Sequence, residues 1–155
     1  MSSKKSICGL KQCQEIGQTC AVFNLRKASR AITQLYEEML RPSGLLPTQF
    51  TLLVAVRSMG PVVISKLADQ LVMDRTTLTR NLKPLERDGL LRVIPGRHDL
   101  RSREIKVTQK GISQLEIALP LWRDAQRKIR KALGDSRLDS LLDDLSAVVE
   151  AAAVH

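Results

Sequence analysis

The stretch Asp74–Gly89, DRTTLTRNLKPLERDG, is the most informative part of this sequence about the fold. At about 3.6 residues per helical turn, three leucines of this stretch share one stripe, which we expect to be buried. The opposite face carries only basic and hydroxyl side chains, namely Thr76, Thr79, Arg80, Lys83 and Arg87. Asp74 is a favoured N-cap residue, and Gly89 stands where helices commonly end in a left-handed residue. The stretch therefore predicts an amphipathic helix whose polar face is free to bind a partner.

A second, shorter helix is predicted just before it, over Ile64–Gln70, with a tight connection at residues 71–73. Short helix, tight turn and polar-faced helix together predict a helix-turn-helix. Arginine can bond guanine in two places, threonine can contact base edges or thymine methyl groups, and lysine suits phosphates. The candidate DNA-binding residues of this helix are Arg75, Thr76, Thr77, Thr79, Arg80 and Lys83. An ordinary amphipathic helix with a solvated basic face remains the alternative when this helix is taken alone.

A basic hairpin is predicted directly after the polar-faced helix. Two short β-like runs, Leu90–Ile94 and Arg103–Thr108, flank a tip that begins with Pro95-Gly96. The tip adds the candidate DNA-binding residues Arg97, His98 and Arg101. A basic tip suits a narrow minor groove, whose potential attracts arginine. We expect Asp99 to pair with Arg101 and stabilise this wing. A helix-turn-helix followed by a basic hairpin is more specific than either part.

The remaining sequence predicts helices around one winged domain that occupies residues 1–155. Residues 1–19 form a polar N-terminal arm, residues 45–108 the winged helix-turn-helix, and residues 20–41 and 109–155 helical regions. The fold class is thus mainly α with a small β-hairpin wing. Residues 109–155 carry more leucine, isoleucine and valine than two helices can hide on a small domain. A second copy of the chain is the natural cover, although the helix over residues 20–41 could also cover this surface.

Bulk composition supports a nucleic-acid partner. The 155 residues have a formal net charge of +9, and ten Lys/Arg against five Asp/Glu lie between Asp74 and Lys110. A basic patch of this kind suggests a polyanion. No apolar run reaches the roughly 20 residues needed to span a bilayer, so we expect a cytoplasmic protein without membrane contact. With no phosphate loop and no nucleophile paired to a base, we expect neither an enzyme nor a bound cofactor.

With these features the chain resembles the MarR family of bacterial regulators. The matching segments are Gly44–Phe50 (GLLPTQF), Leu67-Ala68, Asp74–Arg80 (DRTTLTR), Leu85–Leu90 (LERDGL), and Asp99-x-Arg101 leading to Val107-Thr108-x-x-Gly111. The likeness runs in order from about Cys20 to the C-terminus. It departs at Leu100, where an arginine is common, so that the wing tip carries less charge.

The resemblance implies a homodimer held by the terminal helices, which places two recognition helices on a palindromic operator in double-stranded DNA. Such a regulator is usually a repressor, released by a small-molecule effector or by thiol oxidation. We expect the effector in a cleft between the helix over residues 20–41 and the winged domain. The competing hypothesis is a helical protein-interaction module that does not bind DNA. Binding to DNA that weakens steeply with added salt would favour the regulator over this module.

Three cysteines, Cys8, Cys13 and Cys20, lie near the N-terminus. A zinc site usually needs four ligands and closer spacing, so we expect no metal. The segment from Cys20 is similar to the OhrR branch of the MarR family, which implies a peroxide-sensing thiol with Cys13 or Cys8 as its resolving partner. A thiol at a helix N-terminus is more nucleophilic. That branch holds its cysteine with tyrosines, whereas Asn24 and Gln34 stand at the corresponding places here, and a buried packing cysteine is the alternative.

Overall fold

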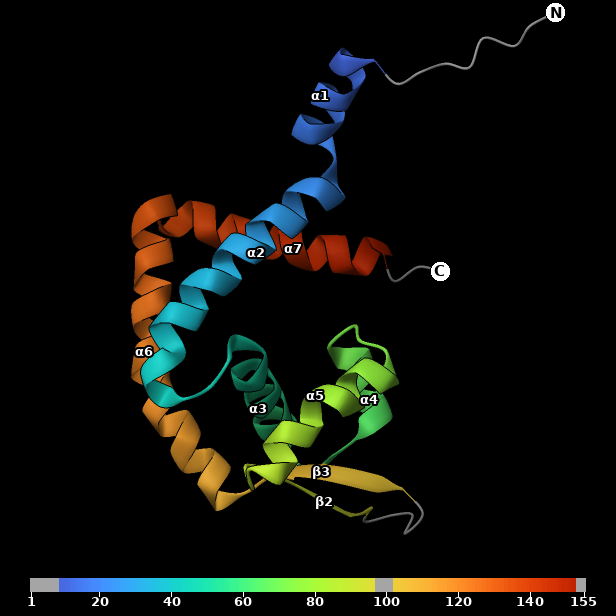
Figure 1. The fold of residues 1–155 in the computed structure, drawn as a ribbon, viewed down its shortest axis with the longest axis vertical. Coiled ribbons are helices and arrows are strands. Elements are labelled where there is room, and N and C mark those ends of the chain that lie inside the picture. The colour runs from blue at the N-terminus through green and yellow to red at the C-terminus, as the bar shows by residue number, and fades with distance from the viewer. Residues whose placement is uncertain (1–8, 97–101, 153–155) are drawn as a thin grey trace, which may run out of the picture. The chain divides into compact units, whose positions relative to one another are not determined.

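The computed structural model describes residues 9–96 and 102–152. The helices in chain order are α1 (Leu10–Thr19), α2 (Ala21–Leu40), the 3₁₀ turn η1 (Arg41–Ser43), α3 (Pro47–Met59), α4 (Ile64–Gln70), α5 (Arg75–Arg87), α6 (Gln109–Leu133) and α7 (Asp135–Ala152). The strands are β1 (Val62–Val63), β2 (Leu91–Pro95) and β3 (Arg103–Val107) (Figure 1). The expectation of a mainly helical chain with a small wing is confirmed. By its contacts the chain divides into two compact units, residues 1–35 and 36–155.

In the first unit, one residue separates two helices. Cys20 has an extended backbone, with φ −70° and ψ 116°, between the end of α1 and the start of α2. The side-chain Nδ2 of Asn24 donates to the carbonyl oxygens of Gly17, Gln18 and Cys20 at 3.3, 3.3 and 3.0 Å. The bonds to Gly17 and Gln18 reach carbonyls in the last turn of α1, where helical amide partners run out, and the Cys20 carbonyl also accepts from the Asn24 backbone amide at 3.1 Å. The N-terminal arm is thus helical from Leu10 onwards.

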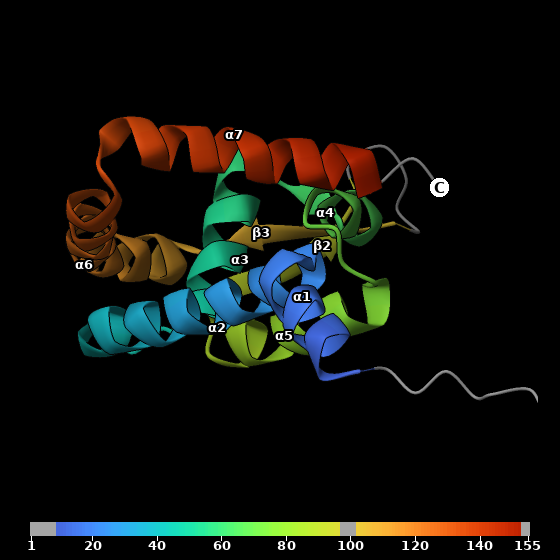
Figure 2. The same ribbon diagram turned by 90° about the horizontal axis from the view of Figure 1, so that it is seen from above.

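In the second unit, a continuous aliphatic core joins the helix-turn-helix to a small sheet. The strands pair antiparallel in the order β1-β3-β2, and β2 and β3 run side by side in both views (Figure 1 and Figure 2). Fully buried side chains come from several elements: Leu40, Leu53, Val56, Leu67, Leu78, Leu85 and Ile105. The hydrophobic stripe of α5 therefore packs into the same core as the sheet, and this fixes the helix relative to the wing.

Two local features differ from the sequence expectations. The strand β1 was not predicted, because two residues are too few to show an alternating pattern. It pairs with β3, Val62 opposite Ile105. The sequence predicts Thr48 as the cap of the next helix, because threonine is a favoured cap residue, but α3 begins at Pro47, so that Thr48 lies within its first turn. Instead the Leu46 amide donates to the Gln49 side chain at 3.0 Å, and proline is well suited to the first helical position.

The long helix α6 starts close against the wing. The Thr108 hydroxyl accepts a hydrogen bond from the Gly111 amide at 3.0 Å and donates to the Gly89 carbonyl at 2.7 Å. The Lys110 ammonium donates to the Asp88 carbonyl at 2.8 Å. The end of α5, the start of β2 and the first turn of α6 are therefore joined by direct hydrogen bonds.

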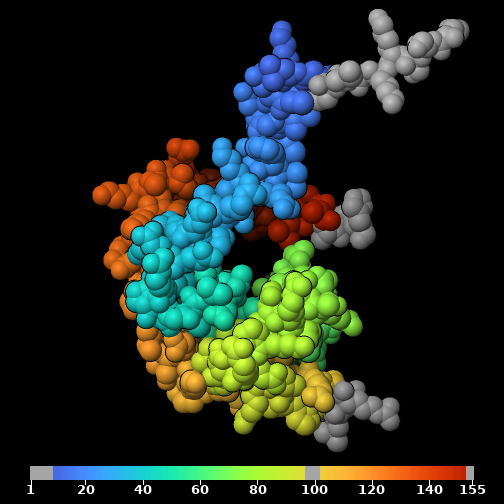
Figure 3. Space-filling model, in the orientation of Figure 1, coloured from blue at the N-terminus to red at the C-terminus, as the bar shows by residue number. Residues whose placement is uncertain are grey.

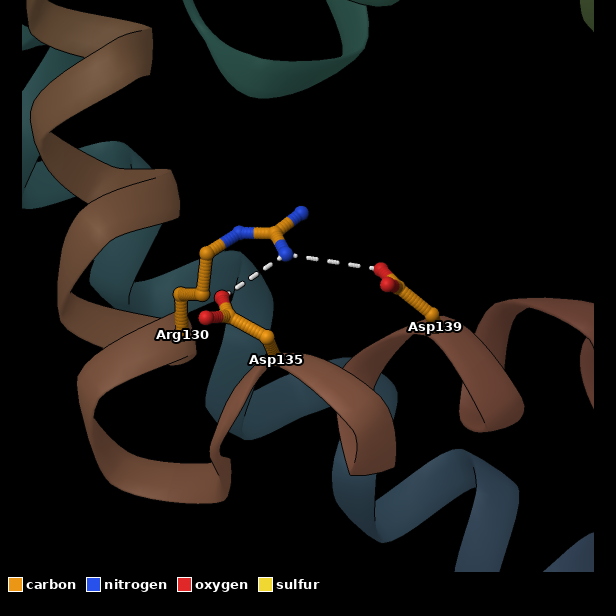
Figure 4. A network of polar contacts seen from close by, with 3 residues as sticks. All are labelled: Arg130, Asp135 and Asp139. Atoms are coloured by element: carbon orange, nitrogen blue, oxygen red, sulfur yellow. Dashed lines mark hydrogen bonds and ion pairs between the residues drawn. The ribbon is translucent and has the colours of Figure 1, made fainter.

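At its other end, α6 turns sharply into α7 at Gly134, whose φ is +86°. Arg130 of α6 pairs with Asp135 at 3.0 Å and with Asp139 at 3.4 Å, both on α7 (Figure 4). The hydrogen bond to Asp135 raises the pKa of the Arg130 guanidinium. The pairs are solvent-exposed, so they orient the corner more than they stabilise the fold.

Candidate nucleic-acid interface

The polar-faced helix α5 is firmly capped at both ends. The Asp74 carboxylate accepts a hydrogen bond from the Thr77 amide at 2.8 Å. Hydrogen bonding to Thr77, first to its side chain and then to its amide, lowers the pKa of Asp74. At the other end the Leu90 amide donates to the Leu85 carbonyl, and Gly89 takes a left-handed φ of +72°. This is the Schellman motif that the glycine predicted.

The two faces of α5 divide as the sequence predicted. Leu78, Leu82 and Leu85 are buried. Seven polar residues are exposed: Arg75, Thr76, Thr79, Arg80, Lys83, Glu86 and Arg87. In the space-filling view the lime-green atoms of α5 form part of the molecular surface (Figure 3). A helix with this exposed face can present cations and hydroxyl groups to a duplex.

Two of the candidate threonines have roles inside the helix. The side chain of Thr77 is half-buried, and its amide serves the N-terminal cap. The Thr79 hydroxyl donates to the Arg75 carbonyl at 2.7 Å. Thr79 can therefore offer a base only an acceptor lone pair or its methyl group, unless this bond breaks. Thr76 and Arg80 are left as the freer groups for reading base edges.

The first helix of the motif, α4, supports α5 from behind. Leu67 and Ala68 are buried at 0% and 2% exposure, and small Ala68 allows close approach of the two helices. The turn between them closes with hydrogen bonds from Val72 to Asp69 and from Met73 to Ala68. Helix, turn and helix thus adopt the arrangement that the sequence predicted.

The structure describes the base of the wing, which is formed by the paired strands β2 and β3. The strands β2 and β3 pair from Leu91 opposite Val107 to Pro95 opposite Arg103. The Gly96 amide then donates to the Ser102 carbonyl at 2.9 Å. The predicted contact residues Arg97, His98 and Arg101, and their predicted partner Asp99, lie outside the described residues. Arg92 and Lys106 lie opposite each other in the pairing and are exposed, a basic pair that the sequence reasoning did not single out.

The described cysteines lie in the first unit. Cys13 is exposed on α1. Cys20 is half-buried and directly precedes the first residue of α2, so it lies at a helix N-terminus as the sequence predicted. Cys8 lies outside the described residues. Seven residues of helix rise about 10 Å, more than the roughly 4.4–6.8 Å between disulfide-bonded Cα atoms. A Cys13–Cys20 disulfide within one chain therefore requires the end of α1 to unwind. No group of metal-binding side chains occurs among the described residues.

A pocket that the sequence did not reveal lies between α3 and α6. Its volume is about 310 Å³, and its lining is mainly apolar. The lining residues are Phe50, Val54, Arg57, Ser58, Ile112, Leu115, Glu116 and Leu119. Its size is at the lower end of small-molecule sites. The pocket was beyond sequence reasoning, because it arises only from the packing of two helices that lie far apart in the chain.

Across the described part of the chain, no helix is both long and apolar enough to cross a membrane.

Comparisons with known proteins agree on one family. The model of the MarR family matches residues 45–102. A crystal structure of the Mycobacterium tuberculosis transcriptional regulator MosR in complex with DNA is 40% identical, with a TM-score of 0.74, and covers 87% of this chain and 99% of that one. A mutant of Escherichia coli MarR complexed with operator DNA gives a TM-score of 0.77 at 24% identity over 86% of this chain and 96% of that one, which shows a common fold.

A relative with a redox-related name is more distant. The Bacillus subtilis organic hydroperoxide resistance transcriptional regulator is 29% identical over 99 residues, which are 64% of this chain and 67% of that protein.

Proposed function

Because this chain belongs to the MarR family of DNA-binding transcription regulators, we propose that it is a repressor whose homodimer binds a palindromic operator through α5. The observation that carries this proposal is the exposed face of α5, which holds three arginines, one lysine and two threonines against a single carboxylate, Glu86. The family consists of regulators and not of enzymes, as the sequence led us to expect.

Each residue of the face has a distinct role in this proposal. Arg80, near the middle of α5, reads guanine, and Thr76 contacts a neighbouring base edge. Lys83 and Arg87, nearer the C-terminal end of α5, hold phosphates and set the register of the helix on the duplex. Arg97, His98 and Arg101 of the wing tip contact the minor groove, and Asp99 orients Arg101.

Helix α7 supports the homodimer. Leu141, Leu142, Leu145, Val148 and Val149 are between 36% and 51% exposed. An apolar row of this length on an outer helix is unfavourable in water, and a second copy that buries it gains the hydrophobic free energy. A dimer also matches the two halves of a palindrome, since a two-fold axis relates both.

The operator assignment is tested by fluorescence anisotropy with a labelled duplex from the region upstream of the chain's own coding sequence. Arg80→Ala should bind operator and scrambled duplexes equally, since the guanine contact is lost. Arg101→Ala should weaken binding to every duplex. Arg123→Ala, which removes the same charge from exposed α6, is the matched control and should keep operator preference. Full discrimination by Arg80→Ala at matched salt would refute α5 as the recognition helix.

For release from DNA we propose a small apolar effector in the α3–α6 pocket. The lining offers an apolar body with one cation, Arg57, and one carboxylate, Glu116, for orientation. Filling the pocket should shift α6, whose first turn is hydrogen-bonded to the end of α5. Val54→Trp should occupy the space and abolish effector response while leaving operator binding in place. An effector response that survives Val54→Trp would exclude this pocket.

Thiol oxidation is the second candidate for release. It is favoured by the place of Cys20 directly before α2, where the helix dipole stabilises a thiolate. Because Cys13 and Cys20 are too far apart along intact α1, oxidation would either unwind α1 or link Cys20 to another thiol. Titration under reduced, peroxide-treated and re-reduced conditions tests this, with Cys20→Ser as control. A loss of affinity that recovers on reduction and is absent in Cys20→Ser supports it.

A further inference from the structure

Val72, in the turn between α4 and α5, has an unusual backbone conformation. Its φ is +52°, and it is the one non-glycine residue with positive φ in the part of the chain that the structure describes. Residues with a β-branched side chain rarely adopt the left-handed region, because the branched Cβ crowds the neighbouring carbonyl oxygen. The valine therefore strains this turn.

The chain provides an internal comparison for this strain. After α4, the amides of Val72 and Met73 donate to the carbonyls of Asp69 and Ala68. After α5, the amides of Gly89 and Leu90 donate to Glu86 and Leu85 in the same pattern. Both helices thus end in a Schellman motif, whose left-handed position favours glycine. The second motif has glycine there, with φ +72°, and the first has valine.

Burial within the described chain offers little compensation for the valine. Its side chain is 70% exposed, so it gains little from burial in the core. Strained residues concentrate at functional sites, where contacts outside the local structure repay the strain. A glycine or asparagine would hold this turn more easily. We therefore look for a molecule outside the chain that the two methyl groups of Val72 contact.

We propose that Val72 is a DNA-contacting residue, whose methyl groups pack on the apolar surface of one nucleotide at the edge of the groove that α5 enters. Its place supports this, because Val72 stands two residues before Asp74, which caps the first turn of α5. The N-terminal residues of a recognition helix are those that meet the bases. This inference rests on the proposed role of α5 as the recognition helix.

The charges near the turn favour an apolar contact over a phosphate contact. Asp69 is exposed on α4, and Asp74 follows Val72 closely in sequence. Two carboxylates repel phosphate, so this turn is poorly suited to hold the backbone of the duplex by charge. Apolar side chains instead pack on thymine methyl groups or on deoxyribose, and both present the same chemistry to valine.

The test compares Val72→Gly and Val72→Asn with the wild-type protein. Each replacement relieves the strain and removes both methyl groups. The Kd for the operator duplex should rise about ten- to twentyfold, as expected from loss of two buried methyl groups. The Tm should equal or exceed that of the wild type. The salt dependence of binding should be unchanged, whereas Lys83→Ala should reduce its logarithmic slope by about 1.

An operator in which deoxyuridine replaces thymidine separates the two apolar surfaces. If Val72 contacts a thymine methyl, the effect of Val72→Gly should vanish on this duplex. If it contacts deoxyribose, the effect should persist. Both results support a DNA contact.

Two controls make the inference refutable. Gly89→Val places the same side chain in the same motif, where an added Cβ has room, with Lys110 Cδ at 3.9 Å as its nearest neighbour. It should lower the Tm by roughly 2–6 °C, and no fall would remove the premise of strain. Arg80→Ala tests α5 independently. If Arg80→Ala loses discrimination while both Val72 variants bind as the wild type does, the inference on Val72 fails and the proposed function stands. A lowered Tm in both Val72 variants would make the valine structural and overturn the inference as well.

Discussion

Gly111 in the first turn of α6 allows the helix to approach the wing, and its replacement by alanine should be strongly destabilising. An added Cβ would lie 2.2 Å from the Leu90 carbonyl oxygen and 2.8 Å from a methyl carbon of Val107. Ordinary contacts between such atoms are about 3.5 Å, so one element must move by roughly 1 Å. The nearest atom belongs to the backbone of the β2 start, and a rotamer change cannot relieve the clash.

The magnitude follows from two opposing effects. Alanine is favoured over glycine within a helix by about 1 kcal/mol. Overpacking against a fixed backbone usually costs about 1–3 kcal/mol and sometimes more, and this contact is severe. We expect a net loss of about 2 kcal/mol, which lowers the Tm of a domain of this size by roughly 4–8 °C. Since Thr108 and Lys110 bind the end of α5, operator affinity should also fall.

Differential scanning calorimetry and the anisotropy titration measure both effects. Gly17→Ala is the matched control, because Gly17 lies within α1 and an added Cβ there meets nothing within 4 Å. It should leave the Tm unchanged or raise it. If Gly111→Ala proved as stable as Gly17→Ala, the close approach of α6 to the wing would be refuted, and with it the hydrogen-bonded route from α6 to α5.

Three further predictions concern the cap, the dimer and the thiols. Because hydrogen bonding to Thr77, first to its side chain and then to its amide, holds the pKa of Asp74 below its usual value, the charged cap stabilises the fold at neutral pH, and this stabilisation is lost as the pH falls through the lowered pKa. Asp74→Ala should therefore lower the Tm more at pH 7 than at about pH 3; an equal loss at both pH values would contradict a charged cap. Leu145→Asp on α7 should give monomers in light scattering. Ser140→Asp, about 140° away around the same helix, should remain a dimer. A persistent dimer of Leu145→Asp would exclude α7 from the interface. Peroxide treatment should lower the helix signal in circular dichroism if a Cys13–Cys20 disulfide forms, and an unchanged signal in the disulfide-linked monomer would show that α1 accommodates it intact.

Much of the winged domain could be predicted from local sequence signals. Asp74 and Gly89 mark the ends of α5 because capping and left-handed termination depend on neighbouring backbone groups alone. The leucine spacing likewise predicted which face of α5 is buried, since helical periodicity converts spacing directly into direction. These features led to the candidate interface before any tertiary contact was considered.

Local sequence signals were enough to predict the helix-turn-helix, the buried and exposed faces of α5, and the two strands of the wing. The gaps and clashes that arise where distant segments meet depend on tertiary packing. The α3–α6 pocket, the close approach of Gly111 to Leu90 and the third strand β1 each depend on residues far apart in the chain. The left-handed Val72 was also beyond sequence reasoning, because local preference disfavours valine there and only the closed turn between two packed helices imposes that conformation.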